Sequence, residues 1–289
     1  MAIEAGVNVS SVQDDLCKDY FRTLERLAEL GYKNVELIGY NKSKYTRFMD
    51  DIPIDQLKEK LTQYDLTVIS AQELGRSDRP IDVHDWDAVC SYYEQINCHS
   101  IVIPTVWMQN RDDAVRIAGE MNRVGQRLKA NGFAFYYHNH AHEFQRDGEE
   151  TLYDILIQNT DPDYVRFELD LGWVLRAGIQ PTEILEKLGS RCEIVHLKDI
   201  NINPRFPVNI FEALKQDGMK AFDSFKIYQS YTSPEDYADL GSGAYDLASL
   251  FTFIKEMGHT RYAIVENIGA SSDKFNSLAS DLDIVRQYI

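Results

Sequence analysis

Short apolar segments alternate with longer amphipathic segments along almost the whole of this chain. The apolar segments have the length of buried strands, and the amphipathic ones repeat their apolar residues every three or four positions, as helices do. The expected strands are 3–9, 34–38, 66–71, 100–104, 133–138, 165–170, 192–197 and 261–266. The expected helices are 15–30, 54–64, 83–96, 114–130, 151–158, 182–188, 247–257 and 273–288.

Eight strand–helix units of this length predict parallel βαβ connections. Eight units favour a closed barrel, since an open doubly wound sheet is usually smaller. No Gly-rich dinucleotide-binding turn follows the first strand, which counts against a Rossmann domain. We therefore predict an α/β fold in which residues 1–289 form a single (β/α)₈ TIM barrel domain.

A polar segment at 201–243 interrupts the alternation after the seventh expected strand. We predict that it is an enlarged loop, on the barrel face that carries active sites in TIM barrels. Gly241 and Gly243, within this segment, either offer backbone N–H groups to a substrate phosphate or simply form a turn.

Charge and composition narrow the choice of partners. The net charge of −16 repels nucleic-acid backbones and anionic membranes, so we expect neither as a partner. The beginning of the chain lacks the features of a secretory signal, and no segment approaches the roughly 18 apolar residues of a membrane span. The four cysteines form no C-x-x-C pair. These features predict a cytoplasmic protein, and they leave open whether it forms a homo-oligomer.

Polar side chains stand at the ends of the last four expected strands, where a TIM barrel places its catalytic groups. Strand five runs into His138 and His140, strand six ends at Asp170, strand seven carries His196, and strand eight ends at Glu266. A lone Asp at a strand end is more often a helix N-cap than a ligand. Carboxylates and imidazoles that converge without cysteine, however, are typical of sites for Mn²⁺, Mg²⁺, Co²⁺ or Zn²⁺. We predict one divalent metal ion here.

Four segments resemble the xylose-isomerase-like TIM barrel superfamily. They are YHNHAHEF at 137–144, FELDLGW at 167–173, VHLKD at 195–199 and VEN at 265–267. Within that superfamily they are most similar to the sugar phosphate isomerase/epimerase group, which includes inosose dehydratases and ketose 3-epimerases. The resemblance covers essentially the whole chain; it is specific for the superfamily and weak for the substrate.

The resemblance implies that Asp170, His196 and Glu266 are metal ligands. Many members have a Glu at the end of the fifth strand, where this chain has His138, and Glu143 follows five residues later. We favour Glu143 as the fourth ligand, because three carboxylates and one imidazole form a familiar site for a hard divalent ion. His138 is the alternative.

The histidines and the lysine near these positions are candidates for proton transfer. His138 and His140 are two residues apart, so on an extended strand they share a face. One of them is expected to act as a general base or to hydrogen-bond the substrate, the alternative being a core histidine. Lys198 is expected to stabilise an enediolate or enolate, or else to form a salt bridge with Asp199.

Other polar and aromatic residues at the same rim are candidates for substrate binding. Trp107 and Trp173 are expected to stack against a sugar ring, unless they belong to the core. Glu36 and Glu73 are expected to hold substrate hydroxyls or to cap helices. Gln72 stands where the superfamily often has a His, which argues against a second metal.

The resulting hypothesis is a metal-dependent sugar or sugar phosphate isomerase or epimerase. The metal would polarise a carbonyl and stabilise an enediolate while a base removes the neighbouring proton. Ketose 3-epimerases of the superfamily use two carboxylates on opposite faces of the substrate, which resemble Glu143 and Glu266. A metal-dependent lyase or dehydratase acting on a keto-inositol or keto-sugar is the alternative. A non-catalytic sugar-binding barrel is the alternative of a different class.

Overall fold

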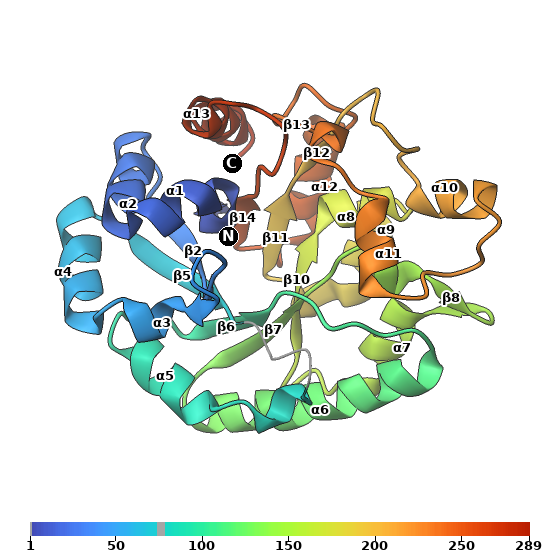
Figure 1. Ribbon diagram of the computed structural model, residues 1–289, viewed down its shortest axis with the longest axis horizontal. Coiled ribbons are helices and arrows are strands. Elements are labelled where there is room, and N and C mark those ends of the chain that lie inside the picture. The colour runs from blue at the N-terminus through green and yellow to red at the C-terminus, as the bar shows by residue number, and fades with distance from the viewer. Residues whose placement is uncertain (1, 74–78) are drawn as a thin grey trace.

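In the computed structural model, which describes residues 2–73 and 79–289, eight parallel strands close into a barrel surrounded by helices (Figure 1). Pairing of β1 with β14, for example Val7 with Val265, completes the ring. The barrel strands are β1 Glu4–Asn8, β2 Asn34–Ile38, β5 Thr67–Gln72, β6 Ser100–Ile103, β7 Ala134–His138, β10 Arg166–Asp170, β11 Ile194–Leu197 and β14 Tyr262–Val265. The predicted fold class, a (β/α)₈ TIM barrel, is confirmed.

The long helices lie between successive strands, as the pattern predicts. They are α2 Tyr20–Glu29, α4 Ile54–Tyr64, α5 Trp86–Glu94, α6 Arg111–Ala130, α7 Leu152–Asn159, α9 Pro181–Leu188, α12 Leu247–Met257 and α13 Lys274–Arg286. The expected helix 15–30 is divided into α1 Gln13–Lys18 and α2. Asp19 separates them because its backbone is extended and its side chain accepts a hydrogen bond from the N–H of Arg22, which starts a new helix.

Short helices and hairpins follow several of the barrel strands. The hairpin of β3 Tyr40–Asn41 and β4 Thr46–Arg47 precedes α3 Phe48–Asp51. The helix α8 Leu171–Arg176 begins directly after β10, where no helix was expected. A second hairpin, β8 Arg146–Asp147 with β9 Glu150–Thr151, follows the fifth barrel strand.

The barrel interior is apolar at one level and polar at the next. Five buried side chains form a cluster separate from the main core: Ile69, Val102, Tyr136, Ile194 and Ile264. Two residues further along the same strands stand His138 and His196, and Glu266 follows β14 in the same spacing. Residues two apart on a strand point to the same face, so the apolar cluster lies beneath the polar groups at the mouth of the barrel.

The enlarged loop after the seventh barrel strand is present and contains helices and a short strand (Figure 1). It contains α10 Ile210–Gln216, α11 Phe225–Ser230 and a two-stranded sheet of β12 Asp199–Ile200 and β13 Tyr237–Ala238. The guanidinium of Arg176 on α8 anchors it by donating to the carbonyl oxygens of Pro207 and Tyr231, at 3.2 and 3.0 Å, and by pairing with Asp236.

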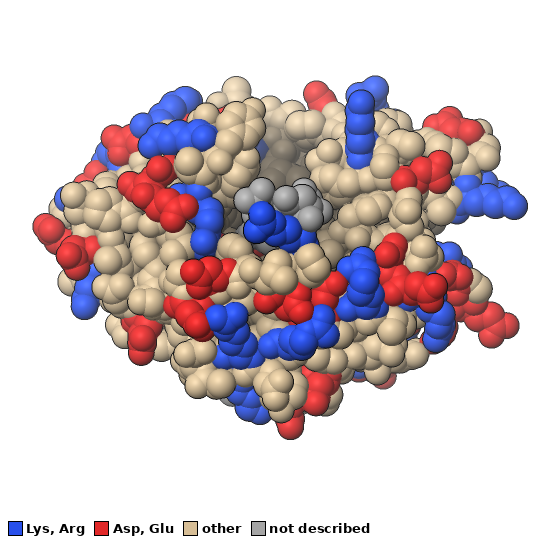
Figure 2. Space-filling view, turned by 60° about the horizontal axis from the view of Figure 1, so that its bottom comes forward, with Lys and Arg blue, Asp and Glu red and all other residues tan. Residues whose placement is uncertain are grey.

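The face of the molecule drawn in Figure 2 shows no large basic patch among its described residues. On the side shown in Figure 2, acidic and basic side chains are interspersed, consistent with the net charge of −16. Within residues 2–73 and 79–289, no helix combines the length and the apolar composition needed to cross a membrane.

Candidate functional site

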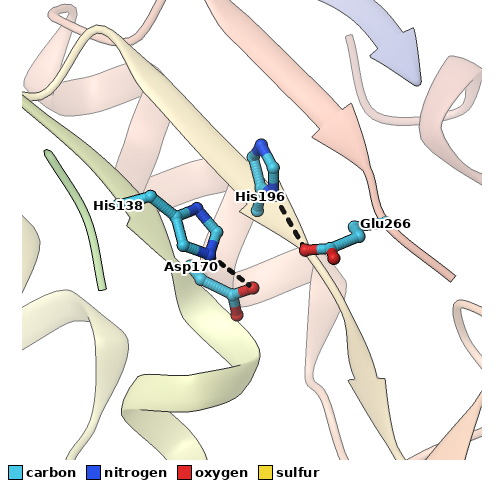
Figure 3. A group of neighbouring side chains, drawn as sticks. All are labelled: His138, Asp170, His196 and Glu266. Carbon is cyan, nitrogen blue, oxygen red and sulfur yellow. Dashed lines mark hydrogen bonds and ion pairs between the residues drawn. The ribbon is translucent and has the colours of Figure 1, made fainter. Parts of the chain in front are cut away.

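Four side chains that can hold a metal ion meet at the carboxyl ends of the barrel strands (Figure 3). They are His138 from β7, Asp170 from β10, His196 from β11 and Glu266 just after β14, and one ligand atom from each lies within 4.8 Å of the others. We call these four residues the metal cluster. His138 Nε2 lies 3.7 Å from Asp170 Oδ2, and His196 Nδ1 lies 3.1 Å from Glu266 Oε2. Two imidazoles with two carboxylates form a donor set that fits a divalent metal ion.

Two of the four side chains, His138 and Glu266, have protonation states that suit a cation. Burial, reinforced by the nearby His196, holds the pKa of His138 well below its ordinary value, so this imidazole is neutral and can act as a ligand. Burial alone would raise the pKa of Glu266, but Lys198 and His196 outweigh it and hold this pKa well below the usual range. Glu266 is therefore a carboxylate at neutral pH. Burial raises the pKa of Asp170, and Glu168 and Glu36 outweigh burial and raise the pKa of His196 well above its ordinary value.

Asp170 has two roles that one carboxylate can combine. Its Oδ1 accepts a hydrogen bond of 2.8 Å from the N–H of Trp173 and thereby caps α8. Its Oδ2 points into the metal cluster. The N-cap and ligand interpretations of this strand-end residue are thus compatible.

Glu143, the ligand that we favoured from the sequence, lies outside the metal cluster. It accepts a hydrogen bond of 2.7 Å from the Tyr137 hydroxyl, and both its oxygens lie 3.0 Å from the N–H of His140. His142 Nδ1 lies 3.1 Å from Glu143 Oε2. The 3₁₀ turn His142–Phe144 directs Glu143 back onto the chain that leaves β7, so the alternative, His138, takes the strand-five place in the metal cluster.

Lys198 lies among the metal-cluster carboxylates and not against Asp199. Its Nζ is 2.8 Å from Asp170 Oδ2 and 2.9 Å from Glu266 Oε2. Burial would lower the pKa of Lys198, but Asp170 and Glu266 outweigh it and raise the pKa above its ordinary value. The site therefore holds an ammonium group at neutral pH next to the candidate ligands.

His140 stands beside the metal cluster as a neutral imidazole. Its ring centroid lies 5.4 Å from that of His138 and 5.2 Å from that of Trp173. Burial, with the nearby charges of His142 and Lys198, lowers its pKa to about 3. Its Nδ1 is buried and has no hydrogen-bond partner among the described residues. A buried, uncharged imidazole with an unpaired nitrogen is able to form a hydrogen bond with a bound ligand.

The two tryptophans lie at different distances from the metal cluster. Trp173 is 5% exposed, and Lys198 Nζ lies 4.9 Å from its ring centroid, so this indole forms part of the site wall. Trp107 stacks on His142, at 5.0 Å between ring centroids, and contacts the edge of Phe225 on α11. It therefore lies one layer further out than Trp173.

The carboxylates of Glu36 and Glu73, expected to hold substrate hydroxyls, are engaged by protein donors. Glu73 accepts from Arg47 at 2.9 Å and from the Tyr93 hydroxyl at 2.8 Å. Glu36 accepts from Ser70 and from Gln72, at 2.6 and 2.9 Å. Both glutamates are almost fully buried. Glu36 links β2 to β5, and Glu73, just after β5, links this strand to β4 and α5.

Gly241 and Gly243 of the enlarged loop bind the side chain of Asp199. The N–H groups of Gly241 and Gly243 donate to Asp199 Oδ2, at 3.0 and 3.1 Å, and the N–H of Tyr245 donates to Oδ1. The turn is therefore closed around the Asp199 carboxylate, and the phosphate interpretation of these two N–H groups is not supported.

Some residues of the site were not identified from the sequence. Glu168 contacts both metal-cluster histidines from within the barrel. Its position could have been inferred from the spacing, because residues two apart on one strand share a face and Glu168 stands two residues before Asp170. Tyr237 and Tyr245 place buried hydroxyls without partners among the described residues. They belong to or follow the enlarged loop, whose path the hydrophobic pattern does not reveal.

Comparisons with known proteins identify the family and agree with the barrel fold. The family described as "Xylose isomerase-like TIM barrel" matches residues 24–288. An inosose dehydratase of Geobacillus kaustophilus (strain HTA426) is 24% identical over 285 residues, covering 89% of this chain and 84% of that protein. The chain spans about half the length of the clostridial inosose dehydratases that it also matches.

Solved structures share the fold. A sugar phosphate isomerase/epimerase from Parabacteroides distasonis ATCC 8503 superposes with a TM-score of 0.71 at 21% identity, covering 99% of this chain and 94% of that one. The IOLI protein, solved with a bound zinc atom, superposes with a TM-score of 0.70 at 14% identity, covering 99% of each chain. At these identities the likeness establishes the architecture alone.

Proposed function

This chain belongs to the xylose isomerase-like TIM barrel family, and on that premise we propose that it is a divalent-metal-dependent lyase that dehydrates a keto-inositol or keto-sugar. Its relatives include inosose dehydratases, which support a sugar-modifying enzyme as the broader class. The observation that carries the finer proposal is that one neutral imidazole, His140, and one ammonium group, Lys198, both lie near the Trp173 ring beside the metal cluster.

The metal cluster would hold the ion through His138, Asp170, His196 and Glu266. When bound, a divalent ion supplies Lewis-acid polarisation of the substrate carbonyl. Cys17, Cys90, Cys98 and Cys192 all lie outside this donor set, which suits Mn²⁺, Co²⁺ or Zn²⁺ bound by oxygen and nitrogen.

His140 and Lys198 have complementary roles in the proposed elimination. His140 removes the proton from the carbon next to the carbonyl, and the C–H electron pair forms the enolate. The C–O bond at the β-carbon then breaks, and the leaving hydroxide takes a proton from the Lys198 ammonium and departs as water. An acid or base placed in this way typically contributes about 10²–10⁴-fold to the rate.

The position of Glu143 favours this lyase over the epimerase that we first inferred from the sequence. Epimerisation with two carboxylates needs one on each face of the substrate. Glu143 is instead bound by the Tyr137 hydroxyl and by the N–H of His140, at 2.7 and 3.0 Å. Glu143 therefore supports the position of His140, and its carboxylate is not free to act opposite Glu266.

Unpaired polar groups near Asp170 suit a substrate rich in hydroxyls. Trp173 Nε1 and the hydroxyls of Tyr237 and Tyr245 are buried and have no hydrogen-bond partner among the described residues. The rings of Trp173 and Tyr237 meet edge to face, with 5.7 Å between their centroids. A buried polar group without a partner is costly, so a polyhydroxylated ligand that pairs with these groups gains affinity.

The test is a product analysis by NMR in D₂O with inososes and keto-sugars, using protein loaded with Mn²⁺, Co²⁺ or Zn²⁺. We expect a dehydrated product, and a loss of about 10²–10⁴-fold in kcat for His140→Gln and for Lys198→Met with metal content unchanged. His259→Gln, an exposed histidine just before β14, is the matched control and should keep full activity. An epimer or isomer without dehydration would establish the isomerase class instead. Binding without any turnover would establish a sugar-binding barrel.

A further inference from the structure

A layer of buried carboxylates lies between the metal cluster and the apolar floor of the barrel. Glu168 on β10 stands opposite His138 in the register of β7 and β10, and two residues before Asp170. Glu36 on β2 belongs to the same layer, and both side chains are fully buried. Carboxylates are rarely buried to this extent unless they have specific partners.

A single oxygen of Glu168 contacts both imidazoles of the metal cluster. Glu168 Oε1 lies 3.0 Å from His138 Nδ1 and 3.0 Å from His196 Nε2. The other nitrogen of each ring lies on the metal-cluster side, with His138 Nε2 near Asp170 and His196 Nδ1 near Glu266. Each imidazole therefore lies between Glu168 and a carboxylate of the metal cluster.

This arrangement is the one expected behind metal-binding histidines. A ligating histidine binds the ion through an unprotonated nitrogen and donates the N–H of its other nitrogen to a carboxylate, which fixes the tautomer and the ring plane. One acceptor oxygen that serves two histidines also fixes the rings relative to each other. The ring centroids of His138 and His196 lie 4.7 Å apart, with their planes 68° from parallel.

The two histidines depend on Glu168 to different degrees. His196 Nε2 also lies 2.9 Å from Glu36 Oε1, so it has a second carboxylate partner. For His138 Nδ1, Glu168 is the carboxylate partner found within the described part of the chain. Loss of the Glu168 carboxylate therefore affects His138 first.

We propose that Glu168 is a positioning residue that holds His138 and His196 in the orientation required of metal ligands, an inference that rests on the metal site of the proposed function. Its effect is exerted through the two imidazoles, without contact with the substrate. Removal of such an outer carboxylate typically weakens metal binding by about 10–100-fold.

The test compares Co²⁺ binding by the wild type, Glu168→Gln and Glu168→Asp, with the affinity measured by calorimetry and the ligand geometry by the visible absorption spectrum. We expect both variants to bind Co²⁺ about 10–100-fold more weakly and with a changed spectrum. The matched control is Glu120→Gln, which removes a buried carboxylate of α6 that contacts Arg116 and the N–H of Ile81, and it should alter neither readout.

Wild-type affinity and an unchanged spectrum in both Glu168 variants would overturn the inference and leave the metal site intact. Failure of the wild type to bind Co²⁺ would instead overturn the metal site and, with it, the proposed function. A third measurement needs no variant: ¹⁵N NMR of the Zn²⁺-loaded wild type should show the proton on His138 Nδ1 and on His196 Nε2. The opposite tautomers would overturn the inference even if both variants failed to fold.

Discussion

The buried ion pair that anchors the enlarged loop yields a prediction about stability. Arg176 on α8 and Asp236 near the end of the loop are both fully buried, with 3.3 Å between Nη2 and Oδ2. The variant Arg176→Met keeps an apolar stem of similar reach and removes the guanidinium. It leaves the Asp236 charge in the interior without its cation.

The expected loss can be worked out from the contacts. Breaking a buried pair by removing one partner typically costs about 3–5 kcal/mol. The variant also loses two hydrogen bonds from Arg176, to the carbonyl oxygens of Pro207 and Tyr231. Asp236 keeps the backbone N–H groups of Arg205 and Ser233 as donors, at 2.7 and 2.9 Å, so the loss should fall near the lower end, about 3 kcal/mol.

Urea denaturation followed by tryptophan fluorescence measures this loss. The matched control is Arg111→Met, which removes an exposed pair with Glu150 at 2.6 Å and should cost much less stability than Arg176→Met, because solvent screens an exposed pair. If Arg176→Met costs no more than Arg111→Met, the pair does not hold the loop. Hydrogen exchange in Arg176→Met should also speed up in β12, α10 and α11 before the barrel strands.

Two further predictions concern the same side of the barrel. Burial raises the pKa of Asp281 to about 6 from 3.8, so its contribution to stability is present below about pH 4 and is lost as the pH rises through 6. Asp281→Asn removes this pH dependence. The unfolding free energy of the variant minus that of the wild type should therefore increase by up to about 3 kcal/mol between pH 4 and pH 7. A difference that stays constant with pH would contradict the assignment. Gly243→Ala should destabilise by about 1–3 kcal/mol, because a Cβ would lie 2.3 Å from Asp199 Oδ1 and from the carbonyl oxygen of Ile200. Gly119→Ala, inside α6 with space around it, should instead stabilise by about 0.5–1 kcal/mol in the same thermal melts, and equal effects of the two substitutions would refute the steric explanation.

The regular part of the fold was readable from the sequence because it follows a strong hydrophobic period. The expected bounds of β2, α4 and α12 agree with the structure at both ends. The helix α8 was missed because it is short, begins directly after β10 and is buried on most sides, so it shows no amphipathic pattern. The helices of the enlarged loop were missed because polar composition gives no period.

The sequence predicts those site residues that stand at the ends of barrel strands. Asp170, His196 and Glu266 converge because parallel strands of one barrel end at the same rim. The choice between His138 and Glu143 depended on the direction of a turn after β7, which hydrogen bonds from Tyr137 and His140 determine. Such contacts between side chains and loops leave no periodic signal in a sequence.

The most direct test of the central claim is the metal content of the purified protein, measured for the wild type, Asp170→Ala and His196→Ala. The metal cluster predicts about one equivalent of divalent ion in the wild type and its loss in both variants, while His259→Gln retains it. A wild-type protein that binds no Mn²⁺, Co²⁺ or Zn²⁺ even after soaking, or variants that bind as well as the wild type, would contradict the metal site and the lyase proposed on it.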